Sequence, residues 1–285
     1  MTDDPQPNPG LHNGLAPPEE GVPSRPAGNL SQPEPLPAGM LSRFPWLTFV
    51  LPLAVYMIVG EFEPRPPATD ATGPDSRWGL AISYDHYPLY YAVRLAATCV
   101  AVALVLPGYR TFRLRVSPGA VVLGLVGAVA WIALAQWRPE AALLNVLGLD
   151  WLTDMGQRSA FNPYERFAAN PGWAYAFLAM RFAGLVLVVP LVEELFLRGF
   201  VMRFVVAEKW WQVPVGQVNT AALVAGTLVP MLMHPGELVA ALVWFSAVTW
   251  WMVRTGRIWD CVLAHAVTNL ALGIYVVSTG AWELM

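Results

Sequence analysis

Apolar residues are concentrated in seven runs that polar stretches separate. Most of these runs approach the ~20 residues that an α-helix needs to cross the hydrocarbon core of a bilayer. The pattern predicts an all-α fold, a polytopic transmembrane bundle of about seven membrane helices. The expected helices cover residues 44–60, 88–107, 118–136, 173–192 with a continuation to about 206, 218–233, 238–253 and 258–278.

Two neighbouring runs, 218–233 and 238–253, are shorter than the others. Sixteen residues rise only ~24 Å, against a hydrocarbon core of ~30 Å. The turn between them, 234–237, is therefore expected below the membrane surface. It would carry His234 into the protein interior, because irregular backbone at that depth needs protein or a water-filled cavity around it.

The first 40 residues have a different composition. They contain ten of the 26 prolines and almost no large apolar residues, so they cannot form a core. We expect residues 1–40 to be a disordered, Pro-rich cytoplasmic tail. Residues 41–285 would be the membrane domain, with a motif-bearing core at 173–278.

Composition supports membrane insertion and excludes other classes. The chain is 56% hydrophobic and 13% charged, against about 25% charged in a soluble domain. With a net charge of −3 and no basic patch, nucleic acid is not an expected partner. The cysteines, Cys99 and Cys261, form no CxxC pair, which argues against a disulfide framework or a thiolate zinc site.

Positive charges in the connections predict the orientation. The connection 107–117 carries three arginines, and the turn before the last helix carries Arg254 and Arg257. Under the positive-inside rule both connections are cytoplasmic, which gives a cytoplasmic N-terminus and an outer C-terminus. Arg181, near the expected outer end of its helix, fits this arrangement poorly.

Three charged residues interrupt the fourth apolar run: Glu193, Glu194 and Arg198. A charge at the centre of a membrane helix costs roughly 2.5–3.5 kcal/mol of insertion free energy, so three charges within six positions indicate a functional role. Glu194 and Arg198 are four residues apart in the order that favours an ion pair. Glu193 points about 100° away on the helix, so its partner must come from another segment.

Histidines in apolar segments provide candidate partners for Glu193. His234 and His265 are the two histidines inside apolar segments, and Asn269 lies one helical turn after His265 on the same face. Counted from the cytoplasmic arginines, Glu193 and His265 are expected at a similar depth. We therefore expect these side chains to meet.

The residue types suit hydrolysis. A carboxylate beside an imidazole in a partly dry cavity can activate water. A second histidine and an amide could stabilise the oxyanion that forms when water attacks a carbonyl. A carboxylate, two imidazoles and an amide are together a set of groups that can hydrolyse a peptide bond.

At these residues the sequence resembles the CPBP family of intramembrane proteases, which includes the type II CAAX prenyl endopeptidases. The family motif EExxxR matches Glu193, Glu194 and Arg198, and HxxxN matches His265 and Asn269. The motif FxxxH matches only in part, because Pro230 stands four residues before His234 where the family has Phe. The motifs lie within about 173–270.

The resemblance implies a role for each residue. Glu193 would activate water together with His234, and His265 and Asn269 would form the oxyanion hole. Glu194 and Arg198 would support the site. The implied substrate is a membrane-anchored peptide or protein, lipidated or CAAX-like, held within the lipid bilayer.

A narrower resemblance comes from the flanking segments near 45–49, 234–237 and 279–282. They are similar to a CAAX protease-related subgroup that accompanies exosortase systems. This similarity implies an exosortase-type sorting system as partner and a multi-pass protein of the bacterial inner (cytoplasmic) membrane.

We expect no cofactor. The sequence has no HExxH motif. Two histidines and one glutamate would bind zinc only if all three converged as ligands, which would leave no separate base. Zinc is the alternative to a metal-free glutamate mechanism.

Other interpretations of the same residues stay open. Glu194 and Arg198 could be a structural ion pair. The chain could also be a non-catalytic membrane scaffold or immunity-type partner of a protein-sorting system, as the Pro230 departure and the long tail suggest. A proton- or ion-coupled transporter would use the same buried carboxylates, although no repeat symmetry is visible.

Overall fold

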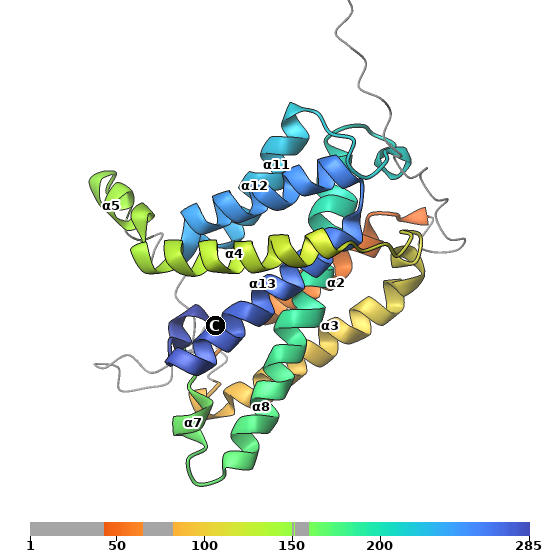
Figure 1. Ribbon diagram of the computed structural model, residues 1–285. Coiled ribbons are helices and arrows are strands. Elements are labelled where there is room, and N and C mark those ends of the chain that lie inside the picture. The colour runs from red at the N-terminus through yellow and green to blue at the C-terminus, as the bar shows by residue number, and fades with distance from the viewer. Residues whose placement is uncertain (1–42, 65–81, 150, 152–159) are drawn as a thin grey trace, which may run out of the picture.

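The computed structural model describes residues 43–64, 82–149, 151 and 160–285, and within them the chain is all-helical (Figure 1). The expected tail, 1–40, lies outside the described residues. The longer helices are α2 (Leu47–Gly60), α3 (Tyr87–Tyr109), α4 (Pro118–Trp137), α5 (Pro139–Val146), α8 (Pro171–Ala183), α11 (Thr220–Met233), α12 (Leu238–Thr255) and α13 (Ile258–Thr279).

Short helical segments complete the described chain. The 3₁₀ turns are η1 (Tyr84–His86), η4 (Trp210–Gln212), η5 (Pro235–Glu237) and η6 (Trp282–Leu284). The short α-helices are α7 (Pro163–Arg166), α9 (Val189–Glu194) and α10 (Met202–Phe204), and the π-helices are η2 (Gly184–Val188) and η3 (Leu195–Val201).

All seven apolar runs form helices. Among the described residues, five stretches are long and apolar enough to cross a membrane, whereas α2 and α11 are shorter apolar helices. One of the five, Pro171–Phe204, contains the fourth apolar run and passes through α8, η2, α9, η3 and α10 without a break. The prediction of a polytopic helical bundle is therefore confirmed.

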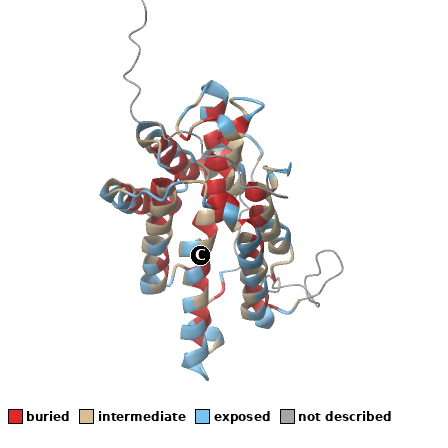
Figure 2. Cartoon of the chain, turned by 90° about the vertical axis from the view of Figure 1, so that its right-hand side faces the viewer, coloured by how far each residue is buried: buried red, intermediate tan, exposed pale blue. Residues whose placement is uncertain are grey.

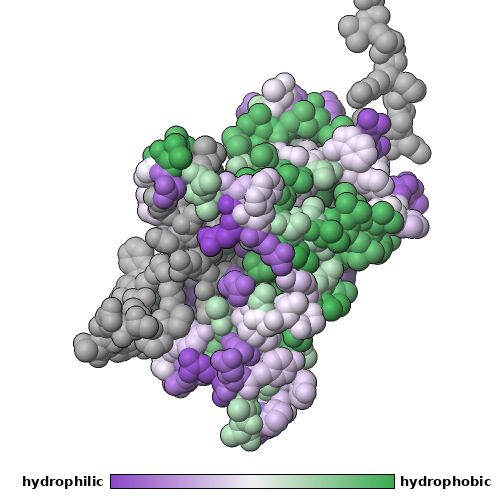
Figure 3. Space-filling view, turned by 60° about the vertical axis from the view of Figure 1, so that its left-hand side comes forward, coloured by the Kyte–Doolittle hydropathy of each residue, from purple (hydrophilic) through white to green (hydrophobic). Residues whose placement is uncertain are grey.

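Side chains follow the pattern expected of a membrane bundle. Buried residues line the inner faces of the helices, while many outward residues are exposed (Figure 2). Hydrophobic side chains gather over the upper part of the face that Figure 3 shows. Large apolar residues with more than half of their surface exposed include Leu89, Val93, Val100 and Leu104 of α3 and Val122, Leu125, Val126 and Val129 of α4. These surfaces suit contact with lipid.

Close packing of α4 on α13 and α12 sets the position of the later helices. A Cβ atom on Gly124 would lie 2.6 Å from the carbonyl oxygen of Ala264, and one on Gly127 would lie 2.5 Å from Trp244 Nε1. Glycine is therefore required at both positions, as is common where membrane helices approach closely. This contact fixes α13, the helix that carries His265.

Candidate active site

The two adjacent glutamates lie on a short α-helical segment between two π-helices. Segment α9 ends at Glu194, η2 precedes it, and η3 follows it. A π-helix widens the turn by one residue and is frequent at functional sites. The sequence pattern predicted a continuous helix through this region, and the local change of pitch was not foreseen.

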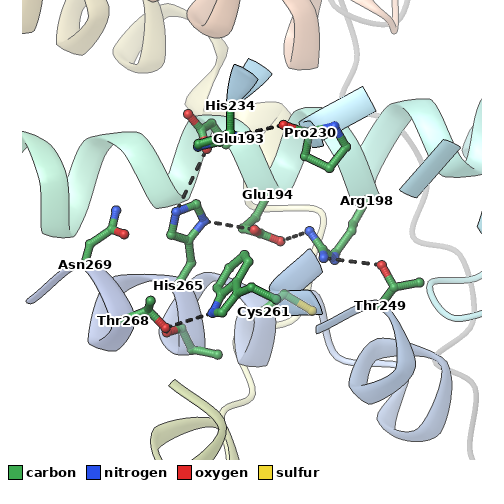
Figure 4. Close-up of polar contacts among 12 residues, drawn as sticks. Glu193, Glu194, Arg198, Pro230, His234, Thr249, Cys261, His265, Thr268 and Asn269 are labelled. Carbon is green, nitrogen blue, oxygen red and sulfur yellow. Dashed lines mark hydrogen bonds and ion pairs between the residues drawn. The ribbon is translucent and has the colours of Figure 1, made fainter. Parts of the chain in front are cut away.

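Glu194 is fully buried and is the centre of an ionic cluster. One carboxylate oxygen pairs with the Arg198 guanidinium, and the other lies 2.9 Å from His265 Nδ1 (Figure 4). Arg198 is also fully buried, and its second terminal nitrogen lies 3.5 Å from Thr249 Oγ1. The predicted pairing of Glu194 with Arg198 is confirmed. The bond between Glu194 and His265 was not predicted.

His265 lies between the two carboxylates. Because Glu194 is paired with a guanidinium and accepts hydrogen bonds, His265 Nδ1 is the donor of their bond. The other ring nitrogen, Nε2, then lies 3.9 Å from Glu193 Oε2. The Trp244 ring packs against the imidazole edge-on, with centroids 4.7 Å apart. Glu193 thus finds a partner on another helix, as the sequence predicted.

A cavity of about 170 Å³ brings the remaining predicted residues together. Glu193 of α9, His234 at the end of α11, and His265 and Asn269 of α13 all line it. Glu193 is largely buried, with 13% of its side chain exposed. The four residues come from three separate parts of the sequence, so the cavity exists only in the folded bundle.

His234 is held by the helix that it terminates. Its backbone N–H bonds to Met231, which leaves the Pro230 carbonyl oxygen without its usual partner four residues on. His234 Nδ1 lies 2.8 Å from that oxygen and donates to it. In a neutral ring Nε2 is then an acceptor.

Pro230 stands where the FxxxH motif has Phe. It lines a small adjoining pocket together with Phe196 and Phe245, and Glu193 also borders this pocket.

Asn269 is oriented by the π-helical segment η2. Its side-chain amide donates to the carbonyl oxygen of Leu185, at 2.8 Å. A carboxamide has two N–H donors, so one stays available for another acceptor. The predicted shared face of His265 and Asn269 is confirmed, since both line the cavity.

Several cavity residues were missed by the sequence analysis. Tyr56 of α2, Trp131 of α4 and Trp244 of α12 form aromatic parts of the wall, and Leu284 and Met285 line it from the C-terminal segment. Nothing in the local sequence marks them, because each is an ordinary apolar or aromatic residue of a membrane helix or turn.

The donor set does not favour a metal centre. Within the described ranges, no group of three or more His, Cys, Asp or Glu side chains is arranged to hold a metal ion. His265 Nδ1 is occupied by Glu194, and His234 Nδ1 by a backbone carbonyl. Glu193, His234 and His265 do not belong to any such group in the described part of the chain.

The family comparison bears on the segment that carries these residues. The family model "Type II CAAX prenyl endopeptidase Rce1-like" matches residues 174–271. Residues 174–271 form an Rce1-like domain. The matched family is a peptidase family, which indicates an enzyme of the CAAX protease type. Neither a curated protein nor a solved structure matches the chain.

The Rce1-like match contains every residue of the three motifs but only part of the cavity wall. Glu193, His234, His265 and Asn269 fall inside it. Tyr56 on α2 and Trp131 on α4 precede it, and Leu272, Leu284 and Met285 follow it. The wall is therefore completed by residues on both sides of the matched segment.

Proposed function

We propose that the protein is an intramembrane endopeptidase that hydrolyses a peptide bond of a membrane-anchored substrate with water activated by Glu193. The observation that carries this proposal is the shared cavity of Glu193, His234, His265 and Asn269 in a buried, aromatic-lined part of the bundle. Such a cavity suits general base catalysis, because water and charge are confined in it.

In the proposed mechanism, Glu193 and His234 hold a water molecule, and Glu193 takes one of its protons. The water oxygen bonds to the scissile carbonyl carbon, and the carbonyl oxygen becomes an oxyanion. The free N–H of Asn269 and a protonated His265 Nε2 stabilise that oxyanion. The carbon–nitrogen bond then breaks, and Glu193 returns its proton to the leaving amine.

The ionic cluster of Glu194, Arg198 and His265 has a separate role in this mechanism. Because Arg198 neutralises Glu194, and Glu194 fixes the orientation of His265, the ring presents Nε2 toward Glu193. A single proton can then move between His265 Nε2 and Glu193. Glu194 and Arg198 are positioning residues that act through His265.

The experiment compares cleavage of lipidated and unlipidated membrane-anchored peptides by the purified wild type and by Glu193→Gln. The amide keeps the shape of the side chain but cannot accept the proton, so we expect a loss of about 10²–10⁴-fold in kcat. Glu63→Gln, a carboxylate outside the cavity, is the matched control. Cleavage by Glu193→Gln at the wild-type rate would refute the proposal.

A chelator added to the wild-type reaction tests the metal question separately. We expect cleavage to survive chelation, because the donor set described above does not converge on a metal. Loss of activity on chelation, with recovery on adding zinc, would make Glu193 and the histidines metal ligands instead.

The substrate class and cellular setting form a narrower part of the proposal. From the arginine distribution we propose a site near the cytoplasmic leaflet and a cytoplasmic N-terminus. The bacterial inner membrane as the setting rests on the resemblance of the flanking segments alone. The Rce1-like match supports the proposal of a CAAX-like substrate. An exosortase-type sorting partner rests on the flanking segments alone, and cleavage of membrane-anchored sorting tails in the peptide library would support it.

A further inference from the structure

Two tryptophans form neighbouring parts of the cavity wall but differ in their hydrogen bonding. The rings of Trp131 on α4 and Trp244 on α12 have centroids 6.5 Å apart and are almost perpendicular. Trp244 Nε1 donates to Thr268 Oγ1 at 3.0 Å. Trp131 Nε1 is buried and has no hydrogen-bond partner among the residues that the structure describes.

An unpaired donor of this kind requires an explanation. Only 7% of the Trp131 surface is exposed, so solvent does not satisfy its N–H. A buried polar group without a partner destabilises the fold, and most such groups in proteins are paired. A phenylalanine would provide a similar apolar surface without that cost. The indole is therefore better explained by an acceptor that enters the cavity than by packing alone.

The ring contacts of Trp131 show which part of the cavity wall it forms. Its ring packs edge-on against the His234 ring, with centroids 5.5 Å apart. His234 in turn lies 5.5 Å, centroid to centroid, from Phe245. Trp131 thus belongs to the aromatic part of the wall next to His234.

The chemistry of the cavity limits the acceptor. An extended peptide brings backbone carbonyl oxygens, which are neutral acceptors that suit a neutral N–H donor. We propose that the Trp131 indole N–H donates a hydrogen bond to a backbone carbonyl oxygen of the peptide in the cavity. This makes Trp131 a substrate-binding residue outside the Rce1-like match, and the inference rests on the proposed function.

The first test replaces the donor and keeps the ring. Substituting 3-benzothienylalanine for Trp131 exchanges the N–H for sulfur in a side chain of nearly the same shape, and Trp131→Phe is the encoded counterpart. Removing one neutral hydrogen bond should raise KM roughly 3- to 10-fold, with a smaller effect on kcat. The same replacement at Trp259, whose N–H donates to Phe112 at 3.1 Å away from the cavity, should leave KM unchanged.

The second test observes the N–H directly in protein that binds peptide without cleaving it. In Glu193→Gln protein labelled with ¹⁵N-tryptophan, saturating peptide should move the Trp131 indole proton resonance downfield, while the Trp259 resonance stays in place. An unmoved Trp131 resonance together with an unchanged KM in the benzothienylalanine variant would overturn the inference.

The two tests separate this inference from the proposed function. A wild-type protein that cleaves no peptide overturns the proposed function. The indole resonance then still decides the inference, because binding does not require cleavage. A wild type that cleaves, with Trp131 variants that bind and cleave like it, overturns the inference alone.

Discussion

Two ionic clusters in this protein, one fully buried and one partly exposed, have similar components and different surroundings. The site cluster consists of Glu194, Arg198 and His265, with Glu193 at its edge. The second cluster, which we call the α2–α3 cluster, consists of Glu63, Arg94, Tyr87 and Arg181. Arg94 lies 3.1 Å from Glu63, Tyr87 donates to the same carboxylate at 2.9 Å, and Arg181 donates to Tyr87.

The clusters differ in where their polar groups are directed. In the α2–α3 cluster, Arg94 also donates to the Tyr56 carbonyl oxygen and stacks on the Tyr56 ring, and Arg181 lies over the rings of Tyr87 and Tyr91. These contacts tie α2, α3 and α8 together. In the site cluster, the ring of His265 presents one nitrogen to Glu193 and the cavity. A buried ion pair alone therefore does not mark a functional site; a polar group that faces a cavity does.

The largest expected effect comes from breaking the site cluster with Arg198→Met. Glu194 would be left as a buried carboxylate without its counter-ion, which costs about 3–5 kcal/mol of stability. Thermal unfolding in detergent measures the loss. The double variant Glu194→Gln/Arg198→Met should recover most of the stability but not the peptidase activity, because no carboxylate then orients His265. Recovery of activity in the double variant would assign the pair a purely structural role.

A smaller effect is expected from displacing Trp244, the part of the cavity wall that packs on His265 of the site cluster. The methyl group of Gly127→Ala would meet the Trp244 indole, which packs on His265. Overpacking of this kind costs about 1–3 kcal/mol. We expect a lower unfolding temperature together with a lower kcat, because the displaced indole shifts the His265 ring. Gly148→Ala, at a position with open space but a positive φ, is a control that perturbs the backbone without touching the cavity.

The smallest effect is expected in the α2–α3 cluster. Glu63 retains 27% of its side-chain exposure, so Glu63→Gln should cost only about 1 kcal/mol, because water can solvate the groups it leaves. Peptide cleavage should continue at the wild-type rate, measured alongside Glu193→Gln. A large loss of activity in Glu63→Gln would show that the two clusters are coupled and would remove the distinction between them.

The sequence predicted the helices and much of the site because both depend on local spacing. Apolar run length marked every membrane helix, and the four-residue spacing of Glu194 and Arg198 predicted their ion pair. The same spacing placed His265 and Asn269 on one face. These features need no knowledge of how the helices pack.

The remaining features depend on tertiary packing, which single-sequence patterns do not contain. The bond between Glu194 and His265 joins residues 71 positions apart. The surroundings of Arg181, which the sequence analysis could not account for, are tyrosines of α3, a distant part of the chain. The π-helical pitch of η2 and η3 also had no signature in the apolar pattern.

The two short apolar helices have a consequence for the surrounding lipid. Helices α2 and α11 contain 14 residues each, which gives a length of ~21 Å against a hydrocarbon core of ~30 Å. Both pack against η3, the segment that carries Arg198. Such hydrophobic mismatch is relieved when the neighbouring acyl chains compress. The membrane should therefore be thinnest beside the glutamate pair, which shortens the path of a polar peptide to the cavity and makes bilayer thickness a determinant of turnover.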